Sequence, residues 1–353
     1  MIHFFGVSIT WFQAIAAVAG IGILVFIHEL GHFIVAKLFK LKVEQFAFGF
    51  GPEIAGFTYG ETRYSLNSIP LGGMVKMPGE NADSATGSPD EFLSQPWYKR
   101  FLIAFSGPLM NYVLAIILFT FVITIWGIPR PSSKPVIGDV LVGYPAAKSG
   151  IKPGDTVIRV DSLPVKAWEE LSGYIHRFPG SPVTLTIQRN GVTFPVTLTP
   201  EKDSASGMGL IGIAPSIDTE KVGAREAVYV SVRMAVYQSV FTLKYLGIKL
   251  VHGEKPELAG PIGVVEILAK AANEGWQALL HLLAVISVAL GLFNLLPIPL
   301  VDGGHMMLAV IEAVYRRPIS KKVIIVSNYV GLSIILTIFL FATYTDILRL
   351  ITK

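Results

Sequence analysis

Four segments of the chain lack aspartate, glutamate, lysine and arginine and are apolar over most of their length. They cover residues 4–27, 101–129, 275–301 and 323–345. Each is longer than the roughly 20 residues that an α-helix needs to cross a hydrocarbon layer about 30 Å thick. The pattern therefore predicts an α-helical polytopic membrane protein with four transmembrane helices.

The residues between the first two apolar segments have a different pattern. Residues 54–59 and 62–69 alternate as strands do and flank Gly60-Glu61, a short-turn signal, and residues 72–77 add a candidate third strand. The glycines of residues 48–52 indicate that this β-hairpin or loop is associated with the membrane, where backbone polar groups must be paired or line a cavity. The polar residues that follow it, up to residue 95, predict a solvated linker.

The long insert after the second apolar segment contains a soluble α+β unit at residues 134–202. A hairpin is expected at Asn190-Gly191, and a short helix at 167–177. Residues 146–155, followed by Val160-Asp161, resemble the signature of bacterial PDZ domains. The resemblance implies that an extended peptide ligand adds a strand to a sheet edge. The alternative is a folded spacer without a ligand.

Residues 220–252 are apolar at helical spacing but contain Arg225, Glu226, Arg233 and Lys244. We expect this helix to be amphipathic and to lie on the surface of the bilayer rather than to cross it. The predicted domains are thus a first transmembrane helix (1–42), a membrane-associated β-loop (43–79), a cytoplasmic linker (80–100), a second transmembrane helix (101–129), the PDZ-like unit (134–202), the interfacial helix (220–252), and the third and fourth transmembrane helices (275–303 and 323–347).

Composition supports a membrane protein and sets its orientation. Of the 353 residues, 52% are hydrophobic and 15% charged, against about 25% charged in soluble proteins. Lysine and arginine gather in residues 37–42, 99–100 and 316–322. The positive-inside rule then places these segments in the cytoplasm, and both termini and the PDZ-like unit outside an inner (plasma) membrane. The net charge of +4 is modest for this length, and no basic cluster is of a kind that suggests nucleic acid, so we expect the lipid bilayer and no nucleic acid as a partner. We expect the first apolar segment to be a retained helix and not a signal peptide.

The candidate chemistry lies where the first apolar segment ends. His28-Glu29-Leu30-Gly31-His32 is an H-E-x-x-H motif, and residues four apart share one face of a helix. His28 and His32 can therefore bind one metal ion, with Glu29 beside them as general base. Ionisable groups at membrane depth are costly, which favours a functional role.

A catalytic zinc site needs a third protein ligand, and the chain contains no cysteine to provide a thiolate. Asp302 is the carboxylate at the end of the third apolar segment, after Pro297 and Pro299, which break the helix. Asp302 and the H-E-x-x-H motif each lie at the cytoplasmic end of a predicted transmembrane helix, so we expect them at the same depth in the membrane. His305 is a rival ligand, but a carboxylate completing two histidines is common in metalloproteases.

These motifs together resemble the site-2 protease family, peptidase M50, over essentially the whole chain. The resemblance rests on H-E-x-x-H in the first helix, Gly107-Pro108 with Asn111 in the second, residues 69–77, residues 259–263, and Asn294 to Gly303, which is similar to the family's N-x-x-P-x-P-x-L-D-G. It is greatest to the bacterial regulator-of-sigma-E proteases. Val301 replaces the usual leucine, and one PDZ-like unit stands where enterobacterial members have two.

The resemblance implies an intramembrane zinc metalloendopeptidase that cuts single-pass transmembrane substrates, such as anti-sigma factors or remnant signal peptides. Zn²⁺ on His28, His32 and Asp302 would activate water, with Glu29 as base. The β-loop, through Gly72, Gly73 and Met74, and the side chain of Asn294 are the candidate substrate-binding groups.

Two other classes of function remain open at this point. A metal transporter would show several ligand sets along a path, and inverted repeats, whereas this chain shows one ligand set at one depth together with a candidate general base. An inactive membrane scaffold bearing a PDZ domain would not need an intact H-E-x-x-H motif.

Overall fold

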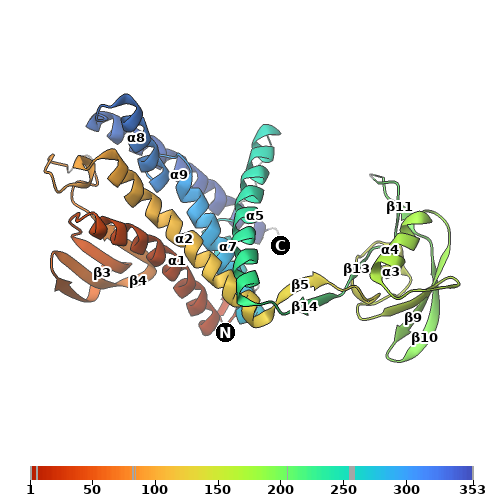
Figure 1. Ribbon diagram of the computed structural model, residues 1–353. Coiled ribbons are helices and arrows are strands. Elements are labelled where there is room, and N and C mark those ends of the chain that lie inside the picture. The colour runs from red at the N-terminus through yellow and green to blue at the C-terminus, as the bar shows by residue number, and fades with distance from the viewer. Residues whose placement is uncertain are drawn as a thin grey trace. The chain divides into compact units, whose positions relative to one another are not determined.

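The computed structural model describes residues 2–4, 7–81, 83, 85–204, 206–253 and 259–351. The chain divides into two compact units (Figure 1). The first comprises Met1–Ile125 and Gly223–Lys353, and the second is the insert Trp126–Val222.

Four long apolar helices form the frame of the first unit. They are α1 (Trp11–Leu38), α2 (Trp97–Trp126), α7 (Trp276–Leu295) and α9 (Lys321–Ile351). Each is long and apolar enough to cross a membrane, which confirms the four predicted spans. Many apolar side chains of α9, including Phe339 and Leu340, are exposed. An exposed apolar surface of this kind is stable in contact with lipid hydrocarbon, whereas in water it would promote aggregation.

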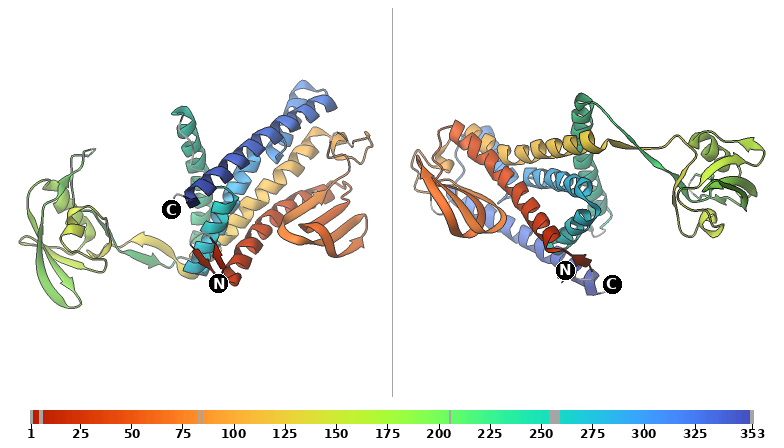
Figure 2. Two further views of the ribbon diagram at one scale, coloured as in Figure 1. Left: turned by 180° about the vertical axis from the view of Figure 1, so that it is seen from behind. Right: turned by 90° about the horizontal axis from the view of Figure 1, so that it is seen from below.

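Shorter elements complete this unit around the long helices (Figure 2). They are β1 (Ile2–Phe4), β2 (Val7–Ile9), the strands β3 (Gln45–Tyr59) and β4 (Thr62–Lys76), the 3-10 helix η1 (Phe92–Ser94), and the helices α5 (Ala224–Val251), α6 (Pro261–Glu274) and α8 (Asp302–Tyr315).

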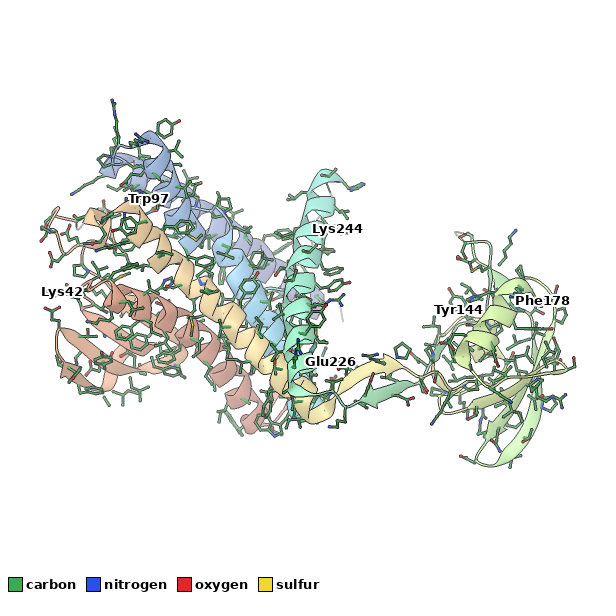
Figure 3. All side chains as sticks on the ribbon, in the orientation of Figure 1. Lys42, Trp97, Tyr144, Phe178, Glu226 and Lys244 are labelled. Atoms are coloured by element: carbon green, nitrogen blue, oxygen red, sulfur yellow. The ribbon has the colours of Figure 1, made fainter. Side chains whose placement is uncertain are left out.

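Helix α5 packs through small side chains. Its buried residues are Ala227, Ser231 and Ala235, and Ser231 Oγ accepts a 3.0 Å hydrogen bond from Thr120 of α2. Glu226 and Lys244 lie on this helix (Figure 3). Its location at the bilayer surface stays a prediction; the structure adds that one face of α5 is buried against the helix frame.

Helix α9 is tied to the start of α6 by a buried carboxylate. Asp346 accepts hydrogen bonds from the backbone N–H groups of Gly260 (3.2 Å) and Gly263 (2.7 Å). A carboxylate is favourable at a helix N-terminus, where N–H groups lack intrahelical partners. A Cβ on Gly260 would lie 2.6 Å from Asp346 Oδ2, so the glycine is required for this contact.

The β-loop is a long hairpin that folds back on itself. It turns at Gly60-Glu61, as predicted, and Phe46 pairs with both Tyr64 and Val75. Residues 45–48 therefore lie between two segments of β4, and the expected third strand is the end of β4. The loop packs closely on α1, because a Cβ on Gly22 would lie 2.4 Å from the carbonyl oxygen of Pro70.

The prediction of a solvated linker after the β-loop is wrong for part of that segment. Glu91 and Phe92 are only 5% and 3% exposed. The Glu91 carboxylate accepts 2.8 Å hydrogen bonds from the backbone N–H groups of Thr86 and Gly87. These bonds fold the polar residues into a compact turn, which allows Phe92 to pack inward.

The second unit is an α+β domain, as expected, and it is larger than the predicted 134–202. Its elements are β5 (Ile128–Pro131), β6 (Ile137–Val140), α3 (Pro145–Lys148), β7 (Thr156–Val160), β8 (Leu163–Pro164), α4 (Trp168–Arg177), β9 (Val183–Arg189), β10 (Val192–Leu198), β11 (Glu201–Lys202), β12 (Gly209–Leu210), β13 (Ile213–Pro215) and β14 (Ile217–Glu220). The pairing of β14 with β5 accounts for the larger extent.

An antiparallel sheet in the order β10-β9-β7-β8 and helix α4 enclose the core of this unit. The hairpin at Asn190-Gly191 is confirmed, with both residues at positive φ. Asp155 is buried and ion-paired with Arg189 at 2.6 Å, and its hydrogen bonds to that guanidinium hold the pKa of Asp155 below its usual range. Tyr144 and Phe178 of this unit are marked in Figure 3.

Candidate metal centre

The two histidines of H-E-x-x-H lie one turn apart on α1, as their spacing predicts. Their Nε2 atoms are 3.2 Å apart, and both rings are buried. Asp302 approaches them, with Oδ2 at 3.0 Å from His28 Nε2 and Oδ1 at 3.3 Å from His32 Nε2. One ligand atom from each of the three residues lies within 4.8 Å of the other two.

Asp302 reaches this point because the chain turns sharply after α7. That helix ends at Leu295, and Asp302 is the first residue of a separate helix, α8, not the end of a spanning helix as expected. The two glycines that follow it allow the turn: a Cβ on Gly303 would lie 2.0 Å from the carbonyl oxygen of Leu296, and one on Gly304 would lie 2.4 Å from that of Ile298.

Helix α8 is held beside α2 by an ion pair between a buried arginine and a half-buried glutamate. Arg100, near the start of α2, is 6% exposed and lies 2.5 Å from Glu312 of α8. A pair with one buried charge is costly to break, because the remaining charge loses its partner. The pair therefore keeps the helix that begins at Asp302 in place.

Two further glycines bring α1 and α2 close together at the site. A Cβ on Gly31 would lie 2.3 Å from the carbonyl oxygen of Ser106, and a Cβ on Gly107 would lie 2.3 Å from His32 Nε2. The second contact leaves no room for any side chain at Gly107. Both imidazoles thus lie against the bare backbone of α2.

The three side chains fit a zinc ion. Zinc binds imidazole nitrogen and carboxylate oxygen, and three protein ligands are typical of catalytic sites. Asp302 Oδ2 is buried, and its neighbour at 3.0 Å is His28 Nε2, a nitrogen that needs its lone pair for the metal and then cannot donate. This oxygen therefore has no hydrogen-bond donor among the described residues, as expected for an oxygen that needs a metal.

Glu29 lies beside the three candidate ligands and is held by the β-loop. Its Oε2 accepts a 3.2 Å hydrogen bond from the backbone N–H of Val75. Glu29, His32 and Asp302 line a cavity of about 40 Å³. That volume holds at least one water molecule, which needs roughly 10–15 Å³ of space for its centre. A carboxylate, a water site and three metal ligands are therefore adjacent.

The same cavity contains groups that the sequence interpretation missed. Glu80 and Phe92 line it, although both were assigned to the linker. Burial raises the pKa of Glu80 to about 7. The sequence does contain one indication that this segment packs inward: the apolar pair Phe92-Leu93 within an otherwise polar stretch.

His305, the rival ligand, lines this cavity too, and its ring lies 6.0 Å from that of Phe92. In the described part of the chain, His305 is not among the side chains whose ligand atoms converge. Burial lowers the pKa of His305. The structure thus brings together the ligand set that includes Asp302.

The candidate substrate-binding residues lie in two places. Gly72, Gly73 and Met74 are in the last part of β4, and a Cβ on Gly73 would lie 3.2 Å from Glu29 Cγ. Asn294 is half-buried in the last turn of α7. Their roles stay predictions.

Comparisons with known proteins bear on the whole chain. A relative from Clostridium acetobutylicum is 32% identical over 348 residues, covering 96% of this chain and 98% of its own, and one from Agrobacterium fabrum is 34% identical over 359 residues, covering 94% of each. Both are named as candidate zinc metalloproteases. The PDZ domain of an SdrC-like protein from Listeria monocytogenes is similar at 21% identity and a TM-score of 0.22, over 24% of this chain and 90% of that structure.

The family model described as peptidase family M50 matches residues 16–338, a range that includes His28, Glu29, His32 and Asp302. With relatives that match at full length as well, the chain belongs to peptidase family M50.

Proposed function

We propose that this multi-pass membrane metalloprotease cuts peptide bonds within the membrane-spanning segments of single-pass proteins, with zinc as its metal. One observation carries the proposal: His28, His32 and Asp302 converge beside Glu29, on and next to a helix that can itself cross the membrane. The names of the full-length relatives support zinc as the metal. Anti-sigma factors and remnant signal peptides are the substrate classes that we expect.

Zinc bound by the three side chains would polarise the scissile carbonyl and lower the pKa of a water molecule to about 7. Glu29 accepts a proton from the water as the water oxygen bonds to the carbonyl carbon. Glu29 then gives this proton to the amide nitrogen, and the C–N bond breaks to leave a carboxyl group and an amine. The backbone N–H of Val75 orients the Glu29 carboxylate for both transfers.

The orientation in the membrane follows from the distribution of lysine and arginine. Residues 37–42, 99–100 and 316–322 would be cytoplasmic, which places the metal site toward the cytoplasmic face and the insert outside the inner membrane. Hydrolysis needs water, and a site near one membrane face has access to it. Both termini would then be extracytoplasmic.

A substrate helix must unwind before its carbonyl can react, and unpaired backbone groups in lipid cost several kcal/mol each. The end of β4 offers an edge on which to re-pair them. The backbone N–H of Val75 points to Glu29, while the carbonyl oxygen of Lys76 accepts a hydrogen bond from the backbone N–H of Glu44 at the opposite edge of the strand. Because alternate residues of a strand direct their N–H groups to the same edge, the N–H of Gly73 also belongs to the edge next to Glu29.

We therefore expect Gly73→Pro to reduce cleavage of a Leu-rich substrate helix more than that of a helix with glycine near the cut. Proline removes the N–H donor at the edge. One lost hydrogen bond is worth about 0.5–1.5 kcal/mol, so the extra loss on the Leu-rich substrate should be roughly 2–10-fold. The measurement is a comparison of cleavage rates for both substrates.

Gly73→Ala is the matched control, because it places a Cβ in the same tight space (3.2 Å from Glu29 Cγ and from Ala47 O) but keeps the N–H. It should slow both substrates by the same factor. An equal loss on both substrates with Gly73→Pro as well would show that this strand is structural only.

The insert carries a groove that suits an extended peptide. Residues of α4 and of the segment 209–215 line a cavity of about 370 Å³. Its walls are mostly apolar, and they include Leu141, Trp168, Ile175, Leu210, Ile211 and Ile213. We propose that a peptide segment of a substrate or another membrane protein binds here, and that the insert controls which substrates reach the protease.

The test of the proposed function is cleavage of a model transmembrane peptide by the purified protein, with and without a zinc chelator. We expect cleavage to stop when the metal is removed and to return when zinc is restored, because the chelated protein keeps its fold but loses the electrophile. Cleavage that persists without bound metal would contradict the proposal. Zinc uptake into vesicles without any cleavage would instead indicate a transporter. A transport path needs several sets of metal ligands, and the described residues contain one set.

A further inference from the structure

Asn111 of α2 is a buried polar residue next to the metal site that the proposed mechanism does not use. Its side chain is 0% exposed, and its Nδ2 lies 2.9 Å from Nδ1 of His28. Its Oδ1 is buried and has no hydrogen-bond partner among the described residues. A buried acceptor without a donor is rare and needs an explanation.

The chemistry of His28 decides what Nδ1 can do. The Nε2 atom of His28 faces Asp302 at 3.0 Å and His32 at 3.2 Å, so it is the nitrogen that a shared metal would bind. A neutral imidazole that uses the lone pair of Nε2 carries its proton on Nδ1. The Nδ1–H group is then a donor, and it needs an acceptor at the position of Asn111.

The oxygen and nitrogen of an asparagine amide have the same shape, so the hydrogen-bond partners decide which is which. The orientation with Nδ2 toward His28 would bring two donors together and leave Oδ1 unpaired. The opposite orientation places Oδ1 against the Nδ1–H of His28, so the histidine donor meets an acceptor, and the amide NH2 takes the other position.

The second histidine provides a precedent within the same site. Nδ1 of His32 lies 2.7 Å from the backbone carbonyl oxygen of Ile103, also on α2. A carbonyl can only accept, so His32 donates from Nδ1 and keeps Nε2 free. Helix α2 thus offers one carbonyl to each imidazole, from the backbone for His32 and from a side chain for His28.

We propose that Asn111 is a positioning residue that accepts the Nδ1–H of His28 through Oδ1, and so holds His28 in the tautomer and orientation that bind the metal. Partners of this kind orient metal-bound histidines, and their loss typically weakens metal binding 10–100-fold. The inference rests on the proposed zinc site and adds to it a residue outside the H-E-x-x-H motif and Asp302.

The test compares zinc affinities of full-length variants, measured by competition with a chromogenic chelator. Asn111→Leu keeps a similar volume but removes the acceptor, and we expect zinc affinity to fall 10–100-fold. Asn111→Asp keeps an acceptor and cannot donate when ionised, and we expect its zinc affinity to equal or exceed that of the unmodified protein. If the Asn111 amide instead donated to His28, Asn111→Asp would lose that donor and bind zinc more weakly. A tenfold or greater loss of zinc affinity with this variant therefore overturns the proposal.

Ser287→Ala is the control for packing between α2 and α7. Ser287 Oγ is fully buried and donates to the backbone carbonyl of Asn111 at 2.8 Å, so it contacts the same residue without involving the Asn111 side-chain amide. This variant should keep its zinc affinity. If Asn111→Leu does not fold, Asn111→Asp still decides between an accepting and a donating amide.

The two hypotheses fail in different ways. If the unmodified protein binds no zinc, the proposed function itself is wrong. If the unmodified protein binds zinc and Asn111→Leu binds it equally well, only the role of Asn111 is wrong. Cleavage assays are not needed for either decision.

Discussion

Glu29→Gln is expected to lower the rate of peptide cleavage by 10²–10⁴-fold while the protein keeps its zinc and its fold. That range is the usual contribution of a positioned general base. The glutamine still offers an oxygen to the N–H of Val75, so the contact with β4 can persist. The three candidate ligands are unchanged. The measurement is the cleavage rate of a model substrate together with the zinc content of the same preparation.

Glu80→Gln is the informative comparison, because Glu80 is the second glutamate of the same cavity. We expect Glu80→Gln to retain far more activity than Glu29→Gln, because Glu29 follows His28 directly on α1 whereas Glu80 lies outside that helix. Activity of Glu29→Gln within about tenfold of the unmodified protein would contradict the role of Glu29 as base. If Glu80→Gln alone abolished cleavage, the base would be Glu80.

Asp302→Asn should weaken zinc binding and abolish most activity together. The amide lacks the negative charge of the carboxylate, while His28 and His32 remain as an incomplete ligand pair. We expect the loss of zinc affinity to exceed the 10–100-fold that is typical for removal of an outer partner of a ligand. The measurement is zinc content by elemental analysis and affinity by chelator competition.

His305→Ala separates Asp302 from its rival. His305 lines the cavity but does not converge with the ligand atoms within the described residues, so this variant should keep its zinc. Full zinc occupancy and full activity of Asp302→Asn would contradict the assignment of Asp302. Loss of zinc in His305→Ala would then identify His305 as the third ligand.

Features that depend on short stretches of the chain were predictable from the sequence. The four spans follow from the absence of charge over more than 20 residues, and the structure has four helices in those places. The proximity of His28 and His32 follows from the helical repeat. The turns at Gly60-Glu61 and Asn190-Gly191 follow from residues that tolerate the required backbone angles, and both turns are present.

Contacts between distant segments needed the tertiary structure. Glu80 and Phe92 enter the metal cavity because the segment after the β-loop folds inward, and its polar composition indicated solvent instead. Asn111 lies 83 residues after His28, and only the close packing of α1 on α2 brings their side chains together. That packing depends on the missing side chains of Gly31 and Gly107, whose effect a sequence pattern does not show.

Asp302 combines both kinds of information. Its type and its place at a membrane boundary made it the candidate third ligand from the sequence. Its distances of 3.0 and 3.3 Å to the two histidines depend on the turn after α7, on the backbone contacts of Gly303 and on the ion pair of Arg100 with Glu312. The sequence by itself therefore determined which groups can bind a metal, because that depends on residue type and local spacing. Only the tertiary structure decided which of them meet, because that depends on how closely separate helices can pack.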